Sequence, residues 1–221
     1  MQAVFDFLQA HKPYFDAAHV ASSVVNLIGW GFGLVLLSLA WRRGGIKSVR
    51  FGPLDFQMQE AVDAAAIAAR DWEAKAPGQK TDVPRIRATI SRAFEQDVAD
   101  KLTGKSILWV DDNPGNNELA VRALRRLHLD IVQETSTEAG LAAMGRRHFD
   151  LVISDMGRGA DMRAGYGLLA AIRSNKNNVP FLIFAGSDNP EFRREAATRG
   201  AQLSTNDMLE LIDTIIKLIG R

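Results

Sequence analysis

The sequence predicts an α/β fold: a doubly wound, five-stranded parallel sheet, preceded by a transmembrane helix and a helical stalk. Two observations predict the sheet. Short apolar runs recur after residue 105 and alternate with amphipathic helical patterns. Acidic or small residues follow these runs directly, as expected where buried strands end. Each parallel pair needs a helical crossover, so strict alternation indicates a parallel sheet covered by helices.

The composition limits the classes of function. The chain has 221 residues, a formal net charge of +1 and no cysteine. Disulfides and thiolate metal sites are therefore excluded. A nearly neutral chain gives no electrostatic indication of nucleic-acid binding, so no nucleic-acid partner is expected.

Residues 20–41 are predicted to form a transmembrane helix, because they include no charged residue and are long enough to cross a hydrocarbon core of about 30 Å. Residues 1–19 would then be a short extracytoplasmic segment. Lys12 is the only lysine or arginine before the span, whereas four basic residues follow it closely: Arg42, Arg43, Lys47 and Arg50. The positive-inside rule therefore predicts a single-pass protein of the inner (cytoplasmic) membrane, with its carboxyl-terminal part in the cytoplasm. A cleaved signal peptide and a buried core helix are the alternatives.

Residues 42–104 are predicted to form a linker and a helical stalk. Gly44 and Gly45 end the apolar span, and helical patterns follow at 57–76 and 83–102. Asp82 and Pro84 are typical of a helix start. Each helix carries one apolar stripe, which favours a helical hairpin or a dimer stalk. A homo-oligomer formed through the stalk or the apolar span remains open.

Residues 105–221 are predicted to form the sheet domain. Its elements follow in order, and each strand is succeeded by a helix. The expected strands are 106–110, 130–134, 151–155, 180–185 and 201–204. The expected helices are 116–127, 137–147, 166–174, 190–199 and 207–218.

Three carboxylates are predicted to share one edge of this sheet. Asp111 and Asp112 follow the first strand, and Asp155 ends the third. Clustered carboxylates repel one another, which raises the pKa of at least one until a cation neutralises them. Hard oxygen ligands suit Mg²⁺, and a carboxylate beside the metal can act as a nucleophile towards a phosphoryl group. Acids that merely cap the strand ends, without a metal, are the alternative.

These motifs resemble the receiver domain of two-component response regulators, over about the last half of the chain. The resemblance implies that Asp155 is the phospho-acceptor, that Asp111, Asp112 and Asp155 bind Mg²⁺, and that the backbone carbonyl of Gly157 completes the metal site. Gly200 and Ala201 match the family's Gly-Ala at the start of the fifth strand. The implied function is signal transduction, with a histidine kinase or phosphotransfer protein as partner and no enzymatic module.

Two positions depart from the family's switch. Ala185 stands where receivers place Thr or Ser at the end of the fourth strand, and Gly186 and Ser187 follow it. The chain also has no Lys-Pro after the fifth strand and reads Ser204-Thr205-Asn206 there. Ser187, Thr205 and Arg158 are therefore the candidates to contact the phosphoryl group, with Arg158 as the source of positive charge or as a solvated loop residue.

Three other functions remain open for this sequence. The first is a phosphorylation-independent pseudo-receiver that serves as a protein-binding scaffold. The second is an enzyme on the same fold, such as a small phosphatase, although no general acid or base beyond the three aspartates is evident near the strand ends. The third is a membrane effector that oligomerises through its apolar helix.

Overall fold

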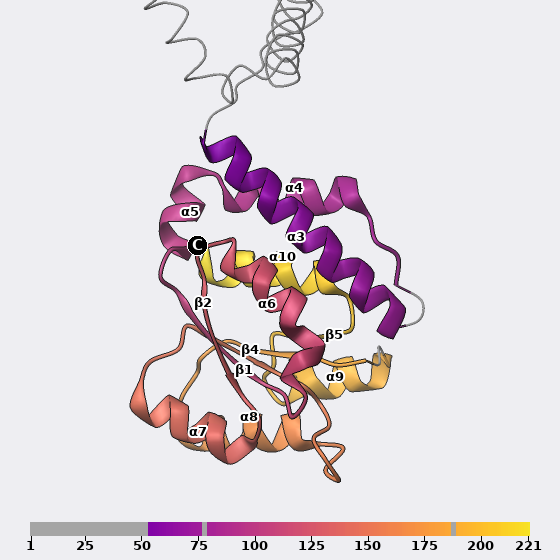
Figure 1. Ribbon diagram of the computed structural model, residues 1–221. Helices are drawn as coiled ribbons and strands as arrows, with labels where there is room; N and C mark the ends of the chain where they lie inside the picture. Colours follow the sequence, from indigo (N-terminus) through magenta and orange to yellow (C-terminus); the bar gives the residue numbers. More distant parts are fainter. Residues whose placement is uncertain (1–52, 77–78, 187–188) are drawn as a thin grey trace, which may run out of the picture. The chain divides into compact units, whose positions relative to one another are not determined.

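The computed structural model describes residues 53–76, 79–186 and 189–221. Within them, five parallel strands form one sheet in the order β2-β1-β3-β4-β5 (Figure 1). The predicted five-stranded parallel sheet is therefore confirmed. The strands are β1 (Ser106–Val110), β2 (Asp130–Glu134), β3 (Leu151–Ser154), β4 (Phe181–Phe184) and β5 (Leu203–Thr205).

The central strands are buried on both faces. Every residue of β1, β3 and β4 is buried, because helices cover both faces of the sheet. Strand β3 pairs with β1 on one side and with β4 on the other. This register aligns Val110 with Ser154, so the acids that follow these two strands meet at one edge of the sheet.

Five helices alternate with the strands, as predicted. They are α6 (Glu118–Arg125), α7 (Thr137–Arg146), α8 (Ala164–Ser174), α9 (Pro190–Thr198) and α10 (Met208–Ile219). A short 3₁₀ helix, η2 (Pro114–Asn117), precedes α6. Apolar residues of α7, α8 and α9 form the core on one face, and those of α6 and α10 belong to the core on the other. Side-chain oxygens of Ser136 and Asp207 cap α7 and α10 by accepting backbone N–H bonds.

The predicted stalk helices pack on the sheet domain (Figure 1). They are α3 (Pro53–Lys75), α4 (Val83–Ala93) and α5 (Gln96–Leu102). Their buried apolar residues, including Val62, Ile86 and Ile90, lie in one core with α6 and α10. The helix expected over 83–102 is interrupted at Phe94, which packs against that core. The apolar stripes of these helices are thus buried within one chain.

The prediction of an inner-membrane location is contradicted. No helix among the described residues is both long and apolar enough to cross a bilayer. The longest of them, α3, carries charged side chains from Asp55 to Lys75, which a hydrocarbon core would not accommodate. The transmembrane helix predicted over 20–41, and the segment 1–19 before it, lie outside the described residues.

Candidate functional site

Three carboxylates converge at the carboxyl ends of β1 and β3. Asp111 and Asp112 follow β1, and Asp155 follows β3. One carboxylate oxygen from each lies within 4.8 Å of the other two. Asp111 is buried, Asp155 is partly buried and Asp112 is exposed. This cluster, predicted from the strand ends, is open to solvent on one side and can receive a small, hard cation.

The loop after β3 fixes two of these carboxylates through backbone N–H groups. Met156 donates its N–H to Asp155 Oδ1 at 2.8 Å, and Gly159 donates its N–H to Asp112 Oδ2 at 2.7 Å. Both donors belong to the loop between β3 and α8. The loop therefore orients one acid from each strand, and among the described residues no hydrogen-bond donor reaches Asp155 Oδ2.

Burial raises the pKa of Asp155 to about 6, and the neighbouring charge of Asp111 adds to this effect. The hydrogen bond from Met156 and the positive charge of Arg158 lower it in part, while Asp112 raises it further. A carboxylate with a raised pKa among other carboxylates indicates unbalanced negative charge. A bound cation would remove this excess.

The metal-free protein should lose stability as Asp155 ionises. The unfolded chain releases this proton near the ordinary value of 3.8, whereas the folded protein holds it to about 6. Stability therefore falls as pH rises through this window, by roughly 2–3 kcal/mol at about 1.4 kcal/mol per pKa unit.

Urea unfolding in a chelator at about pH 4.5 and pH 7.5 checks this effect. Asp155→Asn has no such proton, so its free energy of unfolding should rise relative to wild type as pH increases. A difference between the two proteins that stays constant with pH would show that Asp155 ionises normally.

A pocket of about 610 Å³ opens beside Asp155. Asp112 and Asp155 form its acidic part, Arg163 is the basic residue among the described lining, and apolar side chains form most of the remainder. The other lining residues are Met156, Gly157, Gly159, Met162, Tyr166, Ala185, Gly186, Phe192 and Ser204. The pocket gives a ligand access to the Asp155 carboxylate from the side of α8 and α9.

Comparison with known families agrees with this arrangement. Residues 107–205 match the family model of the response regulator receiver domain. These residues form a response regulator receiver domain. The match runs from the second residue of β1 to the end of β5 and includes the three carboxylates. Receiver domains are signalling modules that interact with histidine kinases or phosphotransfer proteins.

Solved receiver structures cover about half of this chain. The chemotaxis response regulator CheY4 of Vibrio cholerae is 21% identical, with 52% of this chain and 99% of that chain covered and a TM-score of 0.45. The response regulator TrrA from Thermotoga maritima, in complex with Mg²⁺ and BeF, is 24% identical, with 52% and 98% covered and a TM-score of 0.45. With TM-scores below 0.5, these likenesses do not bear on the function of this chain. No curated protein matches it.

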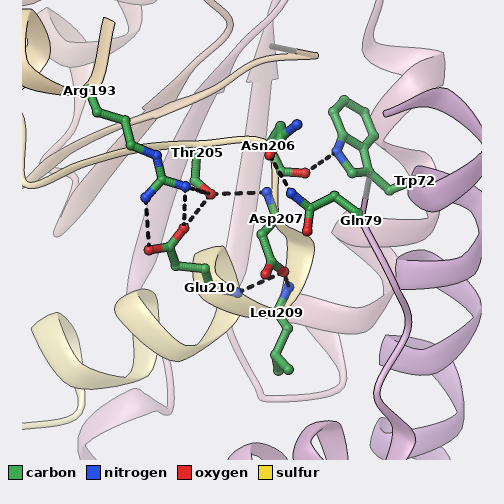
Figure 2. Close-up of polar contacts among 8 residues, drawn as sticks. All are labelled: Trp72, Gln79, Arg193, Thr205, Asn206, Asp207, Leu209 and Glu210. Atoms are coloured by element: carbon green, nitrogen blue, oxygen red, sulfur yellow. Dashed lines mark hydrogen bonds and ion pairs between the residues drawn. The ribbon is translucent and has the colours of Figure 1, made fainter. Parts of the chain in front are cut away.

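The receiver domain positions only part of the predicted switch in the pocket. Ala185 and Gly186 line it, and Ser187 lies outside the described residues. Thr205 is buried, and its hydroxyl donates to Glu210 while accepting the N–H of Asp207 at 3.0 Å (Figure 2). Ser204, which the sequence did not single out, lines the pocket in its place.

Arg158 is buried in the receiver domain, with 8% of its surface exposed. Its guanidinium donates to the hydroxyl of Ser154 at 2.7 Å and to the backbone carbonyl of Asp155 at 3.0 Å. It also donates to Thr137 Oγ1 and to the carbonyl of Ala164, each at 2.8 Å. The guanidinium thus ties the end of β3 to the starts of α7 and α8 and is not a solvated loop group.

The accessory helix α3 contacts the loop after β5. Trp72 Nε1 donates to the backbone carbonyl of Asn206 at 2.6 Å, and Gln79 Nε2 donates to Asn206 Oδ1 at 2.6 Å (Figure 2). The Trp72 ring packs on Phe184, the last residue of β4, with centroids 4.3 Å apart. Asn206, which follows β5, is therefore held by two residues from outside the family match. They are Trp72 of α3 and Gln79, which follows that helix.

Two further site residues escaped the sequence reasoning. Asn117 is buried and donates its amide N–H to Asp111 Oδ2 at 2.5 Å. Gly165 packs against the backbone at Asp155, where an added Cβ would lie only 2.8 Å from the carbonyl oxygen. In the sequence, Asn117 follows the acidic pair Asp111-Asp112 by about one helical turn, and Gly165 lies in the first turn of α8. Neither pattern is specific enough to predict a site residue.

Proposed function

We propose that this protein is a receiver that accepts a phosphoryl group on Asp155 in the presence of Mg²⁺, as part of two-component signal transduction. The observation that carries the proposal is the cluster of Asp111, Asp112 and Asp155 within 4.8 Å at the ends of two adjacent strands of a receiver domain. Asp155 lines the pocket and has one carboxylate oxygen that accepts no hydrogen bond from the described residues.

The three carboxylates fit Mg²⁺. They offer hard oxygen ligands from a partly open site, and one exposed acid allows the ion to keep several waters. Asp111, Asp112 and Asp155 would hold the ion, with the backbone carbonyl of Gly157 as a fourth protein ligand. The ion would neutralise the negative charge of the carboxylates and of the transferring phosphoryl group.

In the transfer, one Asp155 carboxylate oxygen attacks the phosphorus atom of the donor. A new P–O bond forms, and the bond to the leaving group breaks, so that the leaving group departs with the electron pair. The donor is a phosphohistidine of a histidine kinase or phosphotransfer protein, and the leaving imidazole takes up a proton from solvent. Met156 orients the carboxylate for this attack through its N–H bond.

The phosphorylated state would be recognised differently from that of most receivers. Ala185 offers no hydroxyl to the phosphoryl oxygens, and Thr205 already bonds Glu210. Asn206, which follows β5, brings no positive charge. The guanidinium of Arg158 bonds the backbone carbonyl of Asp155 and brings positive charge near its carboxylate. Ser187 remains the candidate for the missing hydroxyl.

Incubation of the full-length chain with acetyl phosphate, followed by intact mass measurement, tests the proposal. With Mg²⁺ we expect one phosphoryl adduct per chain, and with EDTA none. If no adduct forms and calorimetry shows no Mg²⁺ binding, the chain is not a phospho-acceptor, and the cluster consists of acids that cap strand ends.

A further inference from the structure

Asp111 is the most constrained carboxylate of the cluster. Its Oδ1 accepts the backbone N–H of Asn113 at 2.7 Å, and its Oδ2 accepts the side-chain N–H of Asn117 at 2.5 Å. Both oxygens thus have an N–H donor, and the side chain is only 8% exposed. A carboxylate with two such donors is fixed in orientation and retains lone pairs for a cation.

Among the described residues, the bond to Asp111 is the side-chain hydrogen bond that Asn117 makes, and its side chain does not cap α6. Its side chain is 1% exposed, and its Oδ1 has no hydrogen-bond partner. Within the described part of the chain, the other buried side-chain atom without a partner is Trp109 Nε1. An unpaired buried acceptor lowers stability, so an apolar residue would suit this position better if packing alone mattered.

We infer that Asn117 is a positioning residue for the metal site. Its amide N–H holds Asp111 in the orientation that faces Asp112 and Asp155. This inference rests on the proposed Mg²⁺ site. Groups that orient metal ligands in this way typically raise metal affinity by about 10- to 100-fold.

The test is calorimetric titration of Mg²⁺ into the full-length protein, with Asn117→Ala and the similarly shaped Asn117→Leu as variants. We expect both to bind Mg²⁺ about 10- to 100-fold more weakly than wild type. Asn116→Ala is the matched control, because this neighbouring side chain is exposed, and it should bind like wild type.

A second readout separates positioning from a purely structural role. Adduct formation by the Asn117 variants should return to the wild-type level when Mg²⁺ is raised to saturation, because Asp155 itself is unchanged. Variants that bind Mg²⁺ as tightly as wild type, or that form no adduct even at saturating Mg²⁺, would overturn the inference. If wild type itself bound no Mg²⁺, the proposed function and this inference would both be overturned.

Discussion

Asp155→Asn should form no phosphoryl adduct, whatever the concentrations of Mg²⁺ and acetyl phosphate. The amide cannot act as the nucleophile, whereas the Asp155 carboxylate lines the pocket and is oriented by the N–H of Met156. Asp111 has an N–H donor on each oxygen, and Asp112 is exposed, so neither is expected to replace it. Intact mass measurement of wild type and variant gives the comparison.

Asp161→Asn is the matched control for this variant. It makes the same substitution in the same loop, but its carboxylate is exposed and bonds the backbone N–H of Arg163. It should accept a phosphoryl group like wild type. An adduct on Asp155→Asn as abundant as on Asp161→Asn would place the acceptor elsewhere.

Trp72→Ala should lower the free energy of unfolding by about 3–5 kcal/mol, the usual cost of removing a buried aromatic side chain. The Trp72 ring is 8% exposed and packs 4.3 Å from Phe184, which in turn meets Trp109 of β1 edge to face at 5.9 Å. The substitution also leaves the carbonyl of Asn206 without the indole N–H (Figure 2). Chemical denaturation of the full-length protein measures the change.

Ile67→Ala is the control on the same helix. Ile67 is 52% exposed, so its loss should change the free energy of unfolding by no more than about 0.5 kcal/mol. If Trp72→Ala had an equally small effect, α3 would not be an integral part of the receiver's core.

The sheet and the acidic cluster could be predicted because both depend on local pattern. Strands buried on both faces are continuous apolar runs, and parallel strands deliver the acids that follow them to one edge. The predicted boundaries of β1 and β2 match those observed. The position of Asp155 beside Asp111 follows from the pairing of β3 with β1.

The features that escaped prediction depend on contacts between distant residues. Nothing in the local pattern indicates that Trp72 bonds Asn206, 134 positions away. The interruption of a predicted helix at Phe94 comes from packing, since no Gly or Pro marks it. The burial of Arg158 likewise needs partners from β3, α7 and α8 at once.

Mapping the phosphoryl group to one residue is the most direct test of the central claim. The protein is treated with acetyl phosphate and Mg²⁺, reduced with borohydride, which converts an aspartyl phosphate to homoserine, and analysed by peptide mass spectrometry. We expect the conversion at Asp155 alone. Conversion at Asp111 or Asp112, or at no aspartate while wild type carries an adduct, would contradict the assignment of Asp155 as the acceptor.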